Sequence, residues 1–280
     1  SDRLMAGDHL GATQFHSFST YPQALRFLAV VYNWAVKQGF IPVCPSVAMP
    51  KGTDAMKGRP ITEEEFDRMI EKADCIGAKD PEEWRFLLRG LWWSGLRLGE
   101  ALKLHWTDEN HMCVDLDNEL IIMQAHSHKA KRYTESPMAP EFADMLRNVP
   151  AENREGFVFN PLGFRDMGTR LRTDTASKLI VKIGKKAQIK VAETDEGKVK
   201  YASAHDFRRA FGFRWSRRVS STLLKELMRH KNIATTEKFY VGQNAKDTVK
   251  RLRESLGTSL GTSDPKTEKG THDELPQVPN

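Results

Sequence analysis

The sequence predicts a mainly helical α+β protein with one small antiparallel sheet of about three strands. Most apolar residues recur at spacings of three and four, which is the period of a helix that buries one face. Only the stretch from 112 to 138 changes to the pattern of strands around a tight turn. Hydrophobic residues make up 39% and charged residues 29% of the 280 residues, which is enough apolar material for a folded core.

Three well-marked helices are expected before the sheet. The first covers residues 22–39, where apolar residues share one face. The second starts after Thr62, which has the spacing of a capping box with Glu65, so that each side chain satisfies a free backbone amide. The third runs from Pro81, a residue suited to the first turn, to Gly95, which suits a helix end.

A hairpin is expected in the middle of the chain. Residues 112–116 alternate in character, and the turn residues Asp117 and Asn118 follow them. The apolar run 120–123 then forms the returning strand, and residues 132–138 are a candidate third strand. Helical spacing is also expected at 96–104, 140–146, 177–187, 206–218 and 222–229.

Composition divides the chain into four parts. Residues 41–60 contain four prolines and two glycines, a composition that resists regular structure and is typical of an interdomain linker. From residue 257 onward Gly, Ser, Thr, Pro and alternating charges dominate, as in a mobile tail. The expected organisation is a helical unit over 1–50, a linker over 51–60, a main domain over 61–256 and a tail over 257–280.

Charge and cysteine content restrict the function classes. The formal net charge of +6 permits a polyanionic partner without requiring one. The three cysteines, Cys44, Cys75 and Cys113, are widely spaced, which argues against a disulfide framework or a structural zinc site. No run of 18 apolar residues and no signal-peptide pattern occurs in the sequence. We therefore expect a soluble cytoplasmic protein with no membrane segment.

One basic segment holds the first candidate functional residues. As a helix, residues 204–219 place His205 and Arg208 on one face, three residues apart, and Asp206 fits an N-terminal cap. A solvated basic face beside a structural histidine would show the same pattern. The other arginines of the segment are Arg209, Arg214, Arg217 and Arg218.

Two further segments change this balance. Arg97 follows a glycine break at a helix start and is surrounded by apolar residues. A buried guanidinium needs an anionic partner, which is either a ligand or a structural carboxylate such as Glu100. Farther along the chain, His230 stands at a helix end, and Tyr240 follows within one short helix.

Together these segments resemble the three motif boxes of the tyrosine recombinase (phage integrase) family. They occur in the family's order, with the hairpin between the first two boxes, and the resemblance covers about residues 55–250. The helix at 22–39 is similar to the last part of the family's N-terminal core-binding domain. The matching motifs are Gly95-Leu96-Arg97-x-x-Glu100, His205-x-x-Arg208, and His230 followed by Thr235-Thr236-x-x-x-Tyr240.

This resemblance implies a site-specific recombinase or integrase that cuts and rejoins double-stranded DNA. Each strand would be cut through a 3′-phosphotyrosyl link and exchanged through a four-way junction, by a homotetramer on two DNA sites. The family requires neither metal nor nucleotide cofactor, and the protein would be associated with the nucleoid. The alternatives are a type IB topoisomerase, a DNA-binding relative that does not cleave, and a helical regulator unrelated to recombination.

The resemblance also assigns catalytic roles. Arg97 and Arg208 would clamp the non-bridging oxygens of the scissile phosphate by bidentate bonds that lysine cannot copy. His205 and His230 would donate hydrogen bonds to the phosphate or move the tyrosine proton. Tyr240 would be the nucleophile, whose phosphodiester product conserves the bond energy for rejoining.

The family's general acid is a lysine on a hairpin turn. Counting back from residues 136–138, which resemble the family's closing strand, selects Lys129, with Lys131 as the alternative. An exposed lysine that touches a phosphate or nothing would give the same pattern. The residues expected to contact the DNA backbone are Lys131, Arg132, Arg209 and Arg214.

The register of the nucleophile departs from the family. The family's tyrosine usually lies nine residues after the histidine of the third box, and that position is Phe239, whereas Tyr240 is the tenth. A shift of one residue turns a helical side chain by about 100°. Either the local helix is adjusted and Tyr240 is the nucleophile, as we expect, or Phe239 replaces a tyrosine, or the chain does not cleave.

Overall fold

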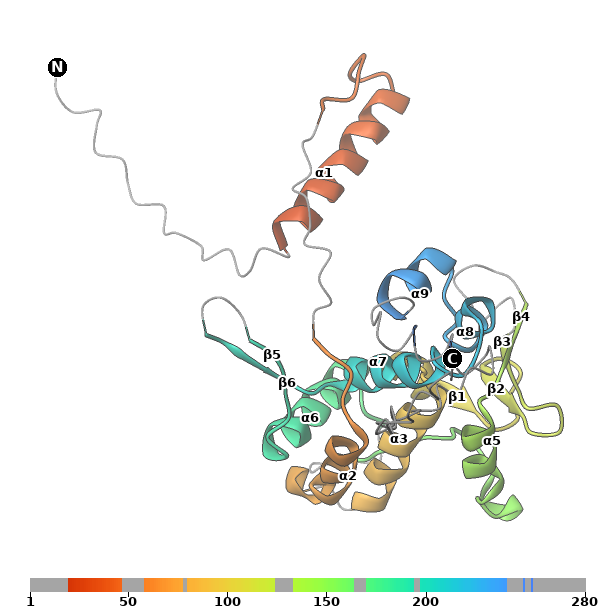
Figure 1. Ribbon diagram of the computed structural model, residues 1–280. Helices are drawn as coiled ribbons and strands as arrows, with labels where there is room; N and C mark the ends of the chain where they lie inside the picture. The colour runs from red at the N-terminus through yellow and green to blue at the C-terminus, as the bar shows by residue number, and fades with distance from the viewer. Residues whose placement is uncertain are drawn as a thin grey trace, which may run out of the picture. The chain divides into compact units, whose positions relative to one another are not determined.

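The chain forms two compact units, which divide between Ala55 and Met56. The structure is a computed structural model (Figure 1). It describes residues 20–46, 58–77, 80–123, 133–163, 170–193, 197–240, 249 and 253. The four-part organisation predicted from composition stays a prediction, and the predicted tail lies outside the described residues.

The first unit is built on one helix, α1 (Thr20–Lys37). The helix is followed by Gly39 in the left-handed region, with a φ of 75°. The ring of Phe40 then folds back to 5.6 Å from the ring of Trp34. Large apolar side chains of α1 are exposed, among them Phe27 at 64%.

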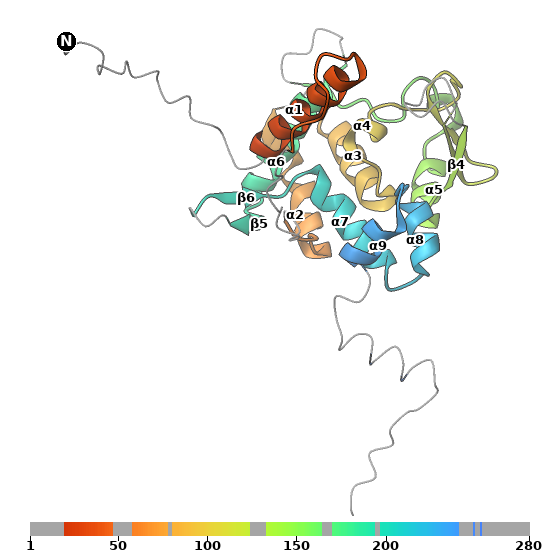
Figure 2. The same ribbon diagram turned by 90° about the horizontal axis from the view of Figure 1, so that it is seen from above.

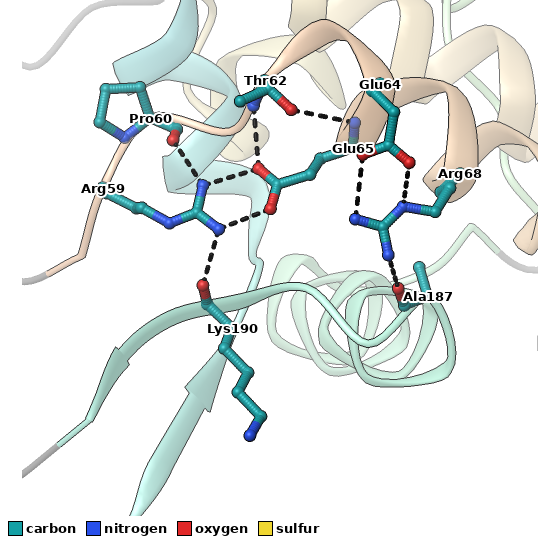
Figure 3. A network of polar contacts seen from close by, with 8 residues as sticks. All are labelled: Arg59, Pro60, Thr62, Glu64, Glu65, Arg68, Ala187 and Lys190. Carbon is teal, nitrogen blue, oxygen red and sulfur yellow. Dashed lines mark hydrogen bonds and ion pairs between the residues drawn. The ribbon is translucent and has the colours of Figure 1, made fainter.

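The second unit begins with a helix that is capped and anchored by charged side chains. The Glu65 amide donates to the Thr62 hydroxyl at 3.2 Å and the Thr62 amide donates to the Glu65 carboxylate at 2.9 Å, which confirms the predicted capping box. Arg59 donates to both carboxylate oxygens of Glu65, at 2.5 and 2.6 Å, and to the carbonyl of Lys190 at 2.9 Å (Figure 3). The start of this unit is thus tied to a segment 131 residues away.

Helices supply most of this unit, which confirms the predicted fold class. The predicted helix over 96–104 is only one turn long, because the chain enters a strand at Leu104. The helices are α2 (Glu63–Glu71), α3 (Pro81–Ser94), α4 (Leu98–Ala101), α5 (Pro140–Arg147), α6 (Thr173–Lys186), α7 (Ala204–Trp215), α8 (Ser221–Leu227) and α9 (Ile233–Tyr240), with short 3-10 turns at Ala73–Ile76 and Ala151–Asn153.

The main sheet has four strands in the order β1-β2-β3-β4. The predicted hairpin is present, and Val114 pairs with Ile121 across it. The sheet differs from the expected antiparallel one because β1 adds a parallel pairing at one edge. A strand of two residues is too short to show a period in sequence. The strands are β1 (Leu104–His105), β2 (Met112–Asp115), β3 (Leu120–Met123) and β4 (Thr134–Pro137).

A second sheet of two strands was not expected from the sequence. It pairs β5 (Lys190–Glu193) with β6 (Val199–Tyr201) in antiparallel fashion. Its strands are short, and charged residues interrupt the apolar alternation, so the pattern carries little strand signal. The two strands lead the chain from α6 into α7 (Figure 1).

The core places α7 against α3 (Figure 2). The ring of Phe66 stacks on Trp92 at 4.4 Å between centroids, and Phe207 meets Trp92 edge-on at 6.5 Å. Gly90 lets the core close, because a Cβ there would lie 2.2 Å from the ring of Phe159. The segment that precedes Arg97 and the helix that carries Arg208 are therefore rigidly packed together. Within the described part of the chain, no helix combines the length and apolar character needed to cross a membrane.

Candidate active site

Arg208 lies at the centre of the candidate site. Its helix, α7, starts with a capping box in which the Ser203 amide donates to the Asp206 carboxylate at 2.9 Å. Arg208 is 3% exposed, and its two terminal nitrogens donate to the backbone carbonyls of Gly95 and Met228. This one side chain therefore joins the segments that the sequence identified as the first and third motif boxes.

Arg97 is held at the surface by Glu100. It stands at the N-cap of α4, where its amide donates to the Glu100 carboxylate at 2.9 Å and its side chain donates at 2.6 Å. The structural carboxylate considered from the sequence is thus its partner within the chain. The Arg97 side chain remains 49% exposed, so it can also contact a ligand.

His230 stands beside both arginines. Its Nδ1 lies 2.8 Å from the hydroxyl of Thr236, which is fully buried in α9. The pKa of His230 is lowered to about 4, first by burial and then by the charges of Arg208, Arg97 and Arg229, against the opposing effect of Glu100. The imidazole is therefore neutral at physiological pH.

His205 occupies the second position of α7. Its side chain is exposed in part, and its pKa is lowered by desolvation and by the charges of Arg209 and Arg208. It lies on the helical turn that carries Arg208, as the spacing predicted. Within the described ranges, no group of three or more His, Cys, Asp or Glu side chains could hold a metal ion.

Arg229 is a residue of this site to which sequence reasoning gave no role. Its side chain is 6% exposed, and its Nε lies 3.6 Å from a carboxylate oxygen of Glu100. Its backbone has a φ of 52°, which is uncommon for any residue other than glycine. Its position immediately before His230 was the available signal.

The predicted nucleophile lies at the end of α9. The backbone of Phe239 and Tyr240 continues this helix to its last residue. These two side chains, and residues Lys129, Lys131 and Arg132 altogether, lie outside what the structure describes. Their predicted roles stay predictions.

Two arginines that the sequence places among the DNA-contacting residues also lie against the protein. The side chain of Arg209 is 8% exposed and donates to the carboxylate of Asp206, which is 0% exposed. Arg214 donates to the Trp92 carbonyl at 2.6 Å, and its guanidinium lies 3.5 Å from the centre of the Trp92 ring. Burial lowers the pKa of Arg214 to about 10. These contacts favour structural roles, because each guanidinium group is engaged by another part of the protein.

Comparison with known proteins identifies a family and a set of similar folds. The Phage integrase family profile matches residues 59–247, which is more than half of the chain. The integrase of the transposon Tn1549 in complex with transposon right end DNA superposes with a TM-score of 0.58 at 18% identity, covering 87% of this chain and 81% of that one. A lambda integrase dimer bound to a COC′ core site gives 0.58 at 12% identity, covering 81% and 75%. No curated protein matched the sequence.

Likeness at these identities establishes the fold, and the family match establishes the class. The chain belongs to the phage integrase family and is a tyrosine-type site-specific recombinase.

Proposed function

We propose that this recombinase cuts and rejoins double-stranded DNA through a 3′-phosphotyrosyl intermediate. The observation that carries the proposal is the position of Arg208, which joins Gly95 to Met228 and so sets Arg97 and His230 beside it. Solved structures with this fold, the Tn1549 and lambda integrases, are bound to DNA, which supports DNA as the partner here.

The arginines are proposed to bind the scissile phosphate. Phosphoryl transfer builds negative charge on the non-bridging oxygens, and preorganised cationic donors stabilise that charge. The two backbone carbonyls fix the plane of the Arg208 guanidinium before DNA arrives. The Glu100 carboxylate likewise orients the Arg97 guanidinium, and the Arg97 side chain remains 49% exposed. Little entropy then remains to be lost when the phosphate binds.

Cleavage requires two proton transfers, for which a neutral histidine is the proposed acceptor and a charged lysine is the proposed donor. The Tyr240 hydroxyl would attack phosphorus and lose its proton to a neutral histidine, either His205 or His230, as the P–O5′ bond breaks. Lys129 would give the departing 5′ oxygen its proton. Attack by the 5′ hydroxyl of an exchanged strand reverses these steps and releases Tyr240, so no metal ion or nucleotide is consumed.

Two further elements of the proposal concern assembly and DNA contacts. Exchange between two DNA sites requires one nucleophile for each of four strands, so a homotetramer on two sites is proposed, acting at the nucleoid. Lys131 and Arg132 are proposed to contact the DNA backbone, as the basic run in the sequence predicts. Arg209 and Arg214 are assigned to the fold, because the Asp206 carboxylate neutralises the charge of Arg209 and the guanidinium of Arg214 lies over the Trp92 ring. Arg208 differs from them because the two carbonyls to which it donates are neutral and do not neutralise its charge.

Covalent capture tests the proposal and selects the target sequence in the same experiment. The full chain is incubated with a pool of nicked duplexes of randomised sequence, and the DNA retained after denaturing washes is sequenced. Mass spectrometry of the DNA-linked peptide then identifies the nucleophile. We expect an adduct on Tyr240, absent from Tyr240→Phe.

Other results would change the assignment in defined ways. An adduct formed only by Phe239→Tyr would place the nucleophile at position 239 and show this chain to be a blocked form. No adduct from either protein, over the whole pool, would contradict cleavage and support a DNA-binding relative. Binding alone does not separate these cases, since all neutralise phosphates.

A further inference from the structure

Two buried arginines join the same two segments of the chain. Arg208 donates to the carbonyls of Gly95 and Met228. Arg229 donates to the carbonyls that immediately precede them, those of Ser94 at 3.4 Å and Leu227 at 2.9 Å. The end of α3 and the end of α8 are therefore held together by two neighbouring guanidinium groups, of which the sequence motifs identify only Arg208.

The backbone at Arg229 is unfavourable for its residue type. A φ of 52° places it in the left-handed region, where glycine fits and a Cβ meets steric resistance. Strain of this kind persists where the surrounding structure requires the residue, and it is concentrated at functional sites. Glycine would fit this backbone better than arginine, so the presence of an arginine indicates that its side chain has a role.

The contacts of Arg229 point toward the surface of the site. Its Nε is buried, has no hydrogen-bond partner among the residues that the structure describes and lies 3.6 Å from a Glu100 carboxylate oxygen. The same carboxylate accepts from the side chain of Arg97 at 2.6 Å. Exposure of the three side chains rises from 6% at Arg229 to 24% at Glu100 and 49% at Arg97. The row runs from the interior to the surface, with Glu100 between two cations.

We propose that Arg229 is a positioning residue. It fixes the position of Glu100, and through Glu100 that of Arg97, relative to His230. This inference rests on the function proposed for the site, because it adds a residue to the same phosphate-binding group. Arg229 acts from the interior of the protein. The terminal nitrogens of its guanidinium hold the two backbone segments, and its Nε attracts the carboxylate of Glu100. Glu100 in turn orients Arg97, the arginine that is proposed to face the DNA.

The charge of Arg229 also acts on His230. Burial and the charges of Arg208 and Arg97 are the larger causes of the low pKa of His230, Arg229 adds to them, and Glu100 opposes them. Removing the guanidinium of Arg229 should therefore raise the pKa of His230. A residue that only supported the backbone would not change that titration.

Two substitutions separate the backbone from the guanidinium. Arg229→Gly removes the side chain and relieves the left-handed backbone, so the fold should be retained. Arg229→Lys keeps the charge but loses the planar fork that reaches Ser94 and Leu227 together. Gln188→Gly is the matched control, because Gln188 has a φ of 57° and follows the C-cap of α6.

The first measurement needs no DNA. Nitrogen-15 NMR of the full chain follows the titration of the His230 ring and the Nε signal of Arg97. In Arg229→Gly we expect the pKa of His230 to rise and the Arg97 signal to move toward that of a solvated arginine, with both unchanged in Gln188→Gly. Unchanged signals in Arg229→Gly would overturn the proposal. If that variant does not fold, an Arg97 signal in Arg229→Lys identical to the parent's would overturn it.

The second measurement uses a duplex captured by the parent chain. Arg229→Gly should bind it with near-parent affinity but cleave it about 100-fold more slowly, since small misplacements of a catalytic group have effects of that size. Its acidic limb of cleavage should move to higher pH, and Arg229→Lys should recover part of the rate. Cleavage at the parent rate with an unmoved pH profile would overturn the positioning role. If the parent captures no DNA, the proposed function fails, and the NMR result still decides the role of Arg229.

Discussion

The hydroxyl of Thr236 lies 2.8 Å from Nδ1 of His230 and is fully buried. It belongs to α9, the helix whose backbone ends at Tyr240. The contact therefore links the orientation of the histidine to the helix that carries the predicted nucleophile.

Replacing Thr236 by valine should slow cleavage while leaving the fold intact. Valine matches the shape of threonine but lacks the hydroxyl, so the His230 ring loses one hydrogen-bond partner that helps to orient it. One net hydrogen bond corresponds to about 1 kcal/mol. We therefore expect the cleavage rate to fall about 5-fold to 10-fold and the free energy of unfolding to fall by about 1 kcal/mol. The measurement is single-turnover cleavage together with urea unfolding. Thr236→Ser keeps the hydroxyl and should cleave almost normally; equal rates for the valine variant and the parent would contradict the role.

The low pKa of His230 makes stability depend on pH. The folded-state value is about 4, against 6.5 for an unperturbed histidine, so between these pH values the unfolded chain binds more protons than the folded one. The contribution of His230 is complete above about pH 6.5 and is lost as the pH falls toward 4. Urea unfolding at several pH values, compared between the parent and His230→Gln, measures it. Parallel pH profiles for the two proteins would show that His230 does not titrate as described.

Arg97→Ala should separate DNA binding from cleavage. Most phosphate contacts of a DNA-bound protein lie outside the reacting group, so affinity should change little, whereas cleavage should fall at least about 100-fold because a cation at the transition state is lost. Arg147→Ala is a matched control, since Arg147 is 41% exposed and pairs with Glu119 at 2.7 Å. Near-parent cleavage by Arg97→Ala, or an equal loss in Arg147→Ala, would remove Arg97 from the site.

Local sequence signals predicted the parts of the fold that depend on neighbouring residues. The capping box of Thr62 and Glu65 is present because both groups lie within one helical turn. The motifs also selected Arg208 and His230, and the charge of Arg208 lowers the pKa of His230. The capping box survives folding because local chain geometry alone brings its two groups together, whereas the motifs that select Arg208 and His230 depend on the family resemblance.

Burial could not be predicted in the same way. Arg209 and Arg214 look like surface charges in sequence, yet Asp206 and Trp92 hold them against the protein. Arg229 escaped notice because Ser94, one of its hydrogen-bond partners, is 135 residues away in the sequence. Long-range packing decides which arginines of a basic segment face solvent, and periodicity contains no information about it.

The structural role of Arg214 is itself testable. Arg214→Ala removes a guanidinium that lies 3.5 Å from the Trp92 ring centre and leaves the Trp92 carbonyl without that donor. We expect a stability loss of about 2 kcal/mol, since cation–π and hydrogen-bond contacts are lost together. The salt dependence of DNA binding should be unchanged, whereas loss of one phosphate contact would reduce its slope by about 0.9. Arg217→Ala, on an exposed turn of the same segment, controls for charge; a reduced slope only in Arg214→Ala would restore its predicted DNA contact.

Gly95 should tolerate no side chain, because two independent constraints meet there. It ends α3 with a φ of 59°, where a Cβ is disfavoured by about 1–2 kcal/mol, and that Cβ would lie 2.4 Å from Cδ1 of Phe211 in α7. Phe211 is fully buried and cannot move aside easily. Gly95→Ala should therefore destabilise the fold by more than the backbone term alone and displace the carbonyl that Arg208 binds. Gly156→Ala is the control, since Gly156 has a φ of 67° but open space around it and should show only the backbone term. Equal losses of unfolding free energy in the two variants would mean that the contact with Phe211 relaxes.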